Sequence, residues 1–98
     1  MRIGWLRIDV LIPVAHSLKE KRRPLKSLVE KLKNRFNVSV AEVDLHDLHQ
    51  RAVIGVAAVA PDGAELAGRL RAVREFIYNN PECQVVGIEE GGLGVSGK

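Results

Sequence analysis

Apolar and polar residues alternate between Ile3 and Ile12, which is the pattern of a strand with one buried face. Successive side chains of a strand point to opposite sides of the sheet, so the residues sort into two sets. The set expected in the core is Leu6, Ile8, Val10 and Ile12. The set on the opposite face is Trp5, Arg7, Asp9 and Leu11. The sequence therefore predicts a half-buried strand that ends at Pro13.

Apolar residues then recur with the period of an α-helix. Ser17 and Glu20 form a capping box, in which the hydroxyl accepts from the N–H of Glu20 and the carboxylate reaches back to the N–H of Ser17. The core-facing residues are expected to be Leu18, Leu25, Leu28, Val29, Leu32 and Phe36. Pro24 leaves two alternatives open, because a proline inside a helix removes a hydrogen bond and can kink it. Either one helix runs through Pro24, or a short turn at 17–22 precedes a helix that begins at Pro24.

Three further strands and a second helix follow. The strands are predicted over residues 38–45, 52–60 and 85–90. Residues 52–60 are apolar on both faces, which is typical of a central strand. Asp62 and Glu65 can cap the second helix, and Asn79-Asn80-Pro81 stops it, since the residue before a proline avoids helical geometry. The inner side of that helix would comprise Leu66, Leu70, Val73 and Ile77.

The element order β-α-β-β-α-β predicts an α+β fold of the ferredoxin-like type. In that fold a four-stranded antiparallel sheet carries two helices on one face. Right-handed crossovers place the first and third strands in the centre. A single ferredoxin-like domain is expected over residues 1–90, and residues 91–98 are expected to form a flexible, glycine-rich C-terminal tail.

Composition narrows the class of protein further. The chain of 98 residues is 46% hydrophobic and 28% charged, which is ordinary for a soluble globular protein and excludes a disordered chain. No apolar run approaches the ~18 residues of a membrane span, and the N-terminal residues are too charged for a secretory signal. The single cysteine, Cys83, excludes an internal disulfide. These features favour a cytoplasmic protein that has no membrane partner.

The charge is distributed unevenly. Residues 1–35 carry ten Lys and Arg against three acidic residues, whereas residues 36–98 carry five against nine. A basic helix favours a polyanion such as RNA, or an acidic partner surface, although a basic face that merely contacts solvent would look the same. The candidate nucleic-acid-binding residues are Lys19, Lys21, Arg22, Arg23, Lys26 and Lys33.

The outer face of the sheet is a second candidate surface. Trp5 and Arg7 would project from it, and the third strand would add small apolar residues. Small RNA-binding domains of this topology stack bases on aromatic side chains of the first and third strands, and this third strand has none. A protein–protein interface, including a homodimer of this chain, therefore fits the face better.

Candidate catalytic and metal-binding residues are sparse. His46 and His49 have the spacing of half a metal site, but zinc needs three or four ligands, so we expect two surface imidazoles instead. His16 lies beside Ser17, but no acidic third member can be assigned. An acylphosphatase of this topology would carry a glycine-containing phosphate loop where this chain has residues 13–16. We therefore expect no catalytic residues, no metal, no cofactor and no enzymatic activity.

Two longer motifs stand out when they are read together: Ser17-Leu18-Lys19-Glu20-Lys21-Arg22 and Phe36-Asn37-Val38-Ser39-Val40-Ala41-Glu42-Val43. They resemble the YlxP-like family of small bacterial proteins of unknown function, and the resemblance extends over about residues 1–90. It implies a ferredoxin-like fold. It also implies a role near the ribosome, because genes of this family often lie among those for translation initiation and ribosome maturation. The positions that it marks are Ser17, Lys19, Glu20, Lys21, Arg22, Asn37, Ser39 and Glu42.

Overall fold

The computed structural model describes residues 1–95 and has the predicted element order. Its strands are β1 (Arg2–Leu11), β2 (Ser39–Asp44), β3 (Arg51–Ala60) and β4 (Gln84–Gly94), and its helices are α1 (Leu18–Arg35) and α2 (Gly63–Tyr78). The four strands form one antiparallel sheet in the order β2-β3-β1-β4. The ferredoxin-like fold and the central position of β1 and β3 are thus confirmed.

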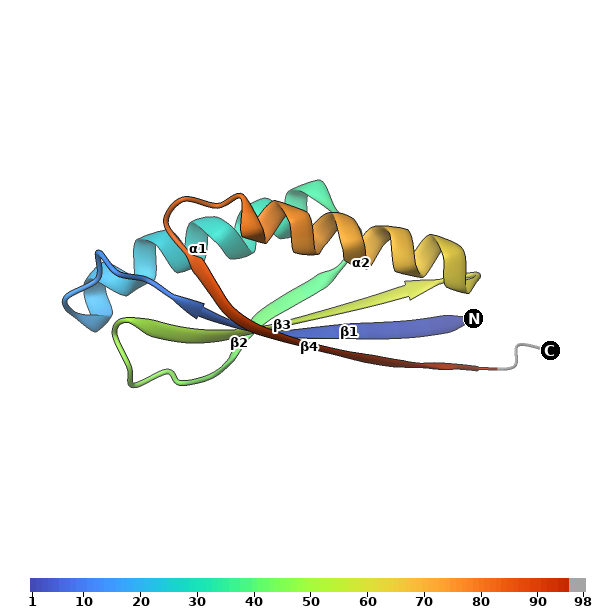
Figure 1. Ribbon diagram of the computed structural model, residues 1–98, viewed down its shortest axis with the longest axis horizontal. Coiled ribbons are helices and arrows are strands. Elements are labelled where there is room, and N and C mark those ends of the chain that lie inside the picture. The colour runs from blue at the N-terminus through green and yellow to red at the C-terminus, as the bar shows by residue number, and fades with distance from the viewer. Residues whose placement is uncertain (96–98) are drawn as a thin grey trace.

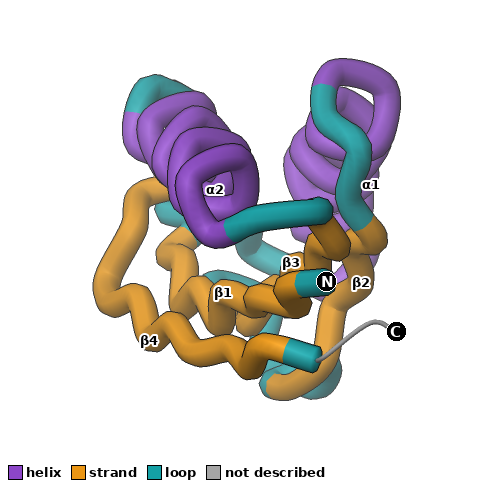
Figure 2. The backbone as a smooth tube through the Cα atoms, turned by 90° about the vertical axis from the view of Figure 1, so that its right-hand side faces the viewer, coloured by secondary structure: helices purple, strands orange, loops and turns teal. Residues whose placement is uncertain are grey.

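Both helices cover the same face of the sheet (Figures 1 and 2). Helix α2 packs on β1, β3 and β4, whereas α1 lies over β2 at one edge. The alternation along β1 explains the core, since Leu6, Ile8 and Val10 point towards the helices and are at most 1% exposed. No helix within the described part of the chain covers the opposite side of β1, and Trp5 and Arg7 are exposed there. The sheet therefore has one buried face and one open face.

Helix α1 is continuous through Pro24, which resolves the two alternatives. Ser17 is its N-cap and accepts from the N–H of Glu20 at 3.1 Å, as the sequence predicts. The Glu20 carboxylate accepts from the N–H of His16 at 2.7 Å rather than from that of Ser17. Pro24 is buried. Leu18 is 48% exposed, against expectation, because it lies at the margin of the apolar stripe in the first turn.

Strand β4 is longer than the sequence predicts. Residues 91–94 continue the strand beside β1, where Gly91 faces Trp5 and Gly92 faces Gly4. The prediction that a flexible tail begins at residue 91 is therefore wrong for these residues and for Val95, whose N–H donates to the carbonyl of Met1 at 2.7 Å. The rest of the predicted tail, residues 96–98, lies outside the described residues. Glycine is required here by close approach: a Cβ at Gly92 would lie 2.5 Å from the carbonyl oxygen of Ile3.

Candidate nucleic-acid interface

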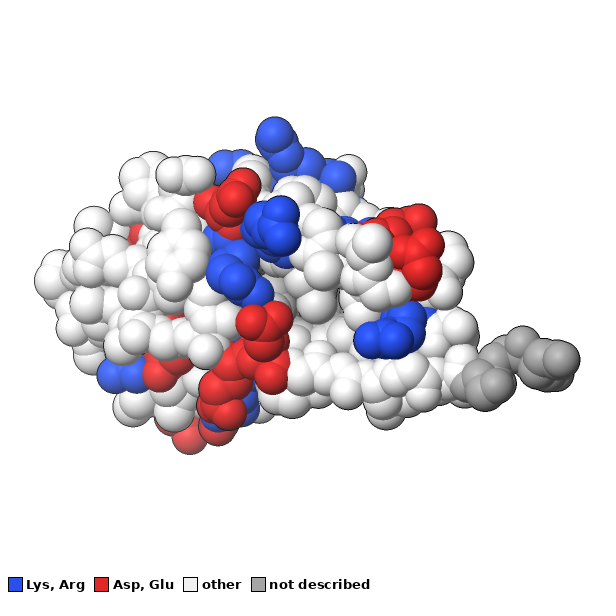
Figure 3. Space-filling model, turned by 45° about the vertical axis from the view of Figure 1, so that its right-hand side comes forward, with Lys and Arg blue, Asp and Glu red and all other residues white. Residues whose placement is uncertain are grey.

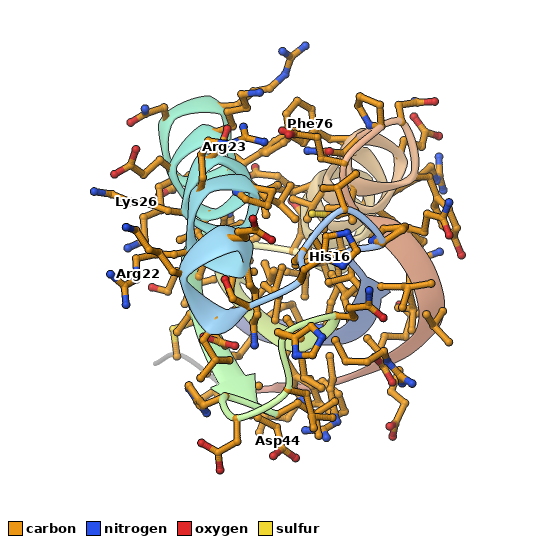
Figure 4. All side chains as sticks on the ribbon, turned by 90° about the vertical axis from the view of Figure 1, so that its left-hand side faces the viewer. His16, Arg22, Arg23, Lys26, Asp44 and Phe76 are labelled. Carbon is orange, nitrogen blue, oxygen red and sulfur yellow. The ribbon has the colours of Figure 1, made fainter. Side chains whose placement is uncertain are left out.

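Four cationic side chains share one exposed side of α1: Lys19, Arg22, Lys26 and Lys33, hereafter the α1 ridge. Spacings of three, four and seven residues bring them to one side of a helix. Figure 4 shows Arg22 and Lys26 pointing outward on the side of α1 that faces away from α2. Lys26 lies 4.0 Å from Glu30, and within residues 1–95 the other three have no carboxylate within 4.0 Å. The ridge is therefore a row of cations largely without partners.

Lys21 does not belong to this ridge. Lys21 is only 3% exposed, and its Nζ lies 2.8 Å from Oε2 of Glu42 on β2. The same ammonium donates to the carbonyl oxygens of Leu45 at 3.1 Å and Leu48 at 2.8 Å. The ammonium thus pairs with one carboxylate and donates to two backbone carbonyls. Lys21 is not available to a phosphate, which corrects the sequence-based prediction.

The bonds made by Lys21 join α1 to the loop between β2 and β3. Leu45 in this loop has a φ of 59°, a left-handed conformation that residues with a side chain adopt at a cost. Its carbonyl is held by Lys21 and its N–H donates to Oδ1 of Asp44 at 2.8 Å. Lys21 is thus a structural residue that fixes the path of this loop.

Arg23 lies outside the ridge as well. Its guanidinium is 2.5 Å from Oε2 of Glu82, in the connection between α2 and β4. The hydrogen bond from Arg23 holds the pKa of the Glu82 carboxyl below its ordinary value. Because its charge is matched by Glu82, Arg23 contributes less to the positive potential than the four ridge residues do.

A groove of about 440 Å³ separates α1 from the end of β2. Apolar side chains form its floor, and Arg22 and Lys26 line its rim. Glu42 and His46 stand at its β2 end, with Nε2 of His46 3.9 Å from Oε1 of Glu42. The floor comprises Leu18, Leu25 and Val29. Sequence reasoning missed this groove, although the two motifs that it singled out, 17–22 and 36–43, supply Lys21 and Glu42, which meet here.

The open face of the sheet carries the two predicted interface residues. Trp5 is 42% exposed, and its indole covers Gly91, where a Cβ would lie 2.5 Å from Cζ2. Arg7 is held by Asp44 at 3.2 Å and Glu89 at 3.9 Å. Beside Trp5 an apolar hollow of about 420 Å³ lies over β2 and β3. Further exposed apolar side chains of this face are Val43, Val59 and Leu93.

The remaining candidate catalytic and metal-binding residues do not form a site. His16, His46 and His49 are exposed, and within residues 1–95 no three His, Cys, Asp or Glu side chains come close enough to hold a metal ion. Cys83 is buried, and burial raises the pKa of its thiol to about 11, so that it stays protonated at neutral pH. No helix in this part of the chain is long and apolar enough to cross a membrane.

Fold and surface together define a class: a ferredoxin-like α+β domain with a cationic helix at one edge and an open, partly apolar sheet face. Residues 3–90 match the model of the family described as "Protein of unknown function (DUF503)". The chain is also similar to the "Uncharacterized protein YlxP" of Bacillus subtilis (strain 168). The two are 38% identical over 82 residues, which are 84% of this chain and 89% of that relative. The chain belongs to this family of unknown function.

Proposed function

We propose that this protein is a cytoplasmic accessory protein, not an enzyme, that binds RNA or a ribosomal subunit through the phosphate contacts of the α1 ridge. The observation that carries the proposal is the exposure of four cations on one side of α1, where Glu30 alone among residues 1–95 places a carboxylate within 4.0 Å of any of them. The helix gains no stability from two of them, because Lys19 and Arg22 lie near its N-terminal end, where positive charge is unfavourable.

The arrangement of the charges suits a polyphosphate better than a single small anion. Lys19 and Lys33 are 14 residues apart, so the ridge extends about 21 Å along the helix. Four cations over that length match several successive phosphates of a nucleic-acid strand. On the face that carries α2 and β4, by contrast, blue and red side chains lie side by side (Figure 3), as in the pair Arg74–Glu90 at 3.0 Å.

Co-sedimentation with ribosomal subunits at low and at high salt tests the proposal. We expect the protein to sediment with a subunit at low salt and to be released as salt rises, because phosphate contacts displace counterions. The double variant Lys19→Glu, Arg22→Glu should abolish co-sedimentation.

A matched control separates this site from net charge. The variant Lys31→Glu, Arg71→Glu changes the charge equally, at exposed positions outside the ridge. It should sediment nearly as the wild type does. Equal loss in both variants, or no sedimentation of the wild type at any salt concentration, would contradict the proposal.

The open sheet face supports a second candidate function, a protein–protein module that forms a homodimer. The observation in its favour is the exposure of Trp5, Val59 and Leu93 on neighbouring strands beside the apolar hollow. Aromatic residues surrounded by small apolar ones are typical of interface centres. Sedimentation equilibrium tests it: a dimer that Trp5→Glu returns to monomer supports the proposal, and a monomer at millimolar concentration excludes the homodimer.

A further inference from the structure

The groove between α1 and β2 lies beside a free edge of the sheet. Strand β2 pairs with β3 on one side and with no strand within residues 1–95 on the other. About half of the backbone N–H and C=O groups of an edge strand point outward without a ladder partner. Helix α1 lies over β2, so a chain that paired with this edge would also contact the flank of the helix.

The flank of α1 presents an apolar strip with a cationic border. Leu18 is 48% exposed and lies on the groove floor with the partly buried Val29. Arg22 and Lys26 border the strip on the solvent side (Figure 4). The groove therefore combines backbone hydrogen-bonding groups, an apolar floor and positive charge, which are the elements of peptide recognition by strand addition.

The spacing of the two cations fits an extended chain. Arg22 and Lys26 are four residues apart, which is about 6 Å along a helix. Side chains on the same face of a strand repeat every ~6.6–6.8 Å. Two acidic residues separated by one other residue would thus meet Arg22 and Lys26 in turn.

We propose that this groove binds an extended, acidic segment of a partner protein, which adds to the sheet as a fifth strand beside β2. Charge complementarity selects the occupant, because the rim is cationic and Glu42 is already neutralised by Lys21. A single-stranded RNA could contact the same two cations, but it has no peptide backbone that could pair with the free edge of β2. The proposal goes beyond RNA binding and does not depend on it, although Arg22 and Lys26 serve both.

Selection from a random dodecapeptide display library on the purified full-length chain at low salt tests this proposal. We expect selected peptides to carry acidic residues two positions apart with apolar residues between or beside them. The best selected peptide, fluorescently labelled, should protect amide hydrogens of β2 from exchange. The same peptide with alternate backbone nitrogens methylated should bind at least about tenfold more weakly, because strand addition needs those N–H groups.

Two leucines of equal exposure provide the matched variants. Leu18→Gln, at 48% exposure on the groove floor, should weaken peptide binding about tenfold. Leu48→Gln, at 47% exposure and outside the groove, should leave it unchanged. Neither change should alter RNA binding by the ridge. Failure of the peptide-binding proposal can therefore be distinguished from failure of the RNA-binding proposal. The proposal would be overturned if no acidic sequences were selected. It would also be overturned if Leu18→Gln left peptide binding unchanged and the peptide did not protect β2 from exchange.

Discussion

The two helices occupy equivalent places in the two β-α-β halves, yet most basic residues of α2 are paired within the fold and those of the α1 ridge are not. In α2, Arg69 donates to the carbonyl of Val59 at 2.8 Å and lies 2.7 Å from Glu65, and Arg74 lies 3.0 Å from Glu90. Two of its three arginines are thus used within the fold. In α1 the four ridge cations point to solvent, and Lys26 alone has a carboxylate nearby, at 4.0 Å.

This difference shows which charges the fold itself explains. A cation that is bonded to backbone carbonyls and a carboxylate has a structural role, as Arg69 has. Lys21 has such a role inside α1, because it is buried, pairs with Glu42 and donates to the carbonyls of Leu45 and Leu48. Within residues 1–95, Lys19, Arg22 and Lys33 lie within 4.0 Å of no carboxylate, and Lys26 lies 4.0 Å from Glu30. The role that we propose for these cations is therefore a functional one.

The largest effect is expected from Lys21. Lys21→Met should lower the free energy of unfolding by about 3–5 kcal/mol, because it leaves the charge of Glu42 partly buried without its partner. Urea denaturation monitored by circular dichroism measures this. Adding Glu42→Gln should restore part of the loss. The ridge variant Lys19→Met should change the free energy of unfolding by no more than about 0.5 kcal/mol. Equal losses of unfolding free energy for Lys21→Met and Lys19→Met would contradict the distinction between a structural Lys21 and a ridge cation that the fold does not need.

A smaller effect is expected from the arginines of α2. The Arg69 side chain is 16% exposed, and Arg69→Ala removes its bonds to Val59 and Glu65. We expect a loss of about 1–2 kcal/mol of unfolding free energy, the usual cost of leaving a carbonyl without its charged donor. Arg22→Ala on the ridge should cost no more than about 0.5 kcal/mol. Thermal unfolding of both variants checks this, and a larger loss for Arg22→Ala would contradict the comparison.

The smallest effect concerns Arg23, the α1 cation that pairs with Glu82. The pKa of Glu82 is lowered from 4.5 by the hydrogen bond from Arg23. A carboxyl whose pKa is lower in the folded state stabilises the fold above its ordinary pKa, and this contribution disappears as pH falls. The stability difference between wild type and Arg23→Gln should therefore be present at pH 6 and shrink steadily below about pH 4.5. Denaturation curves across pH 2–6 measure this difference. A stability difference that stayed constant over this range would show that the Arg23–Glu82 pair does not contribute to the pH dependence of stability.

Most of the fold follows from local patterns in the sequence. Alternation identified the buried face of β1, and the capping residues Ser17 and Asp62 begin α1 and α2 as predicted. The doubly apolar 52–60 segment is the central strand β3. The end of β4 was missed because glycines usually mark loops. Here they are needed for the indole of Trp5 and for the close approach of the two strands, which are tertiary features.

The candidate site was predicted less completely. The side of α1 that bears the ridge follows from helical spacing, and that same spacing places Lys21 in line with Leu25, Leu28 and Leu32. That signal could have identified Lys21 as buried, but its charge suggested otherwise. Its partners Glu42, Leu45 and Leu48 are more than 20 residues away, so no local pattern connects them to Lys21. The groove likewise forms only when α1 lies against β2.

The salt dependence of RNA binding shows whether the α1 ridge cations bind phosphates. Fluorescence anisotropy with a labelled single-stranded RNA would give the slope of log K against log salt for the wild type and two doubly neutralised variants. Arg22→Gln with Lys33→Gln should reduce the magnitude of the slope by about 1.4, at ~0.7 for each phosphate that is no longer neutralised. Lys31→Gln with Arg71→Gln, which removes equal charge elsewhere, should leave the slope nearly unchanged. Equal slopes for wild type and both variants would contradict the account.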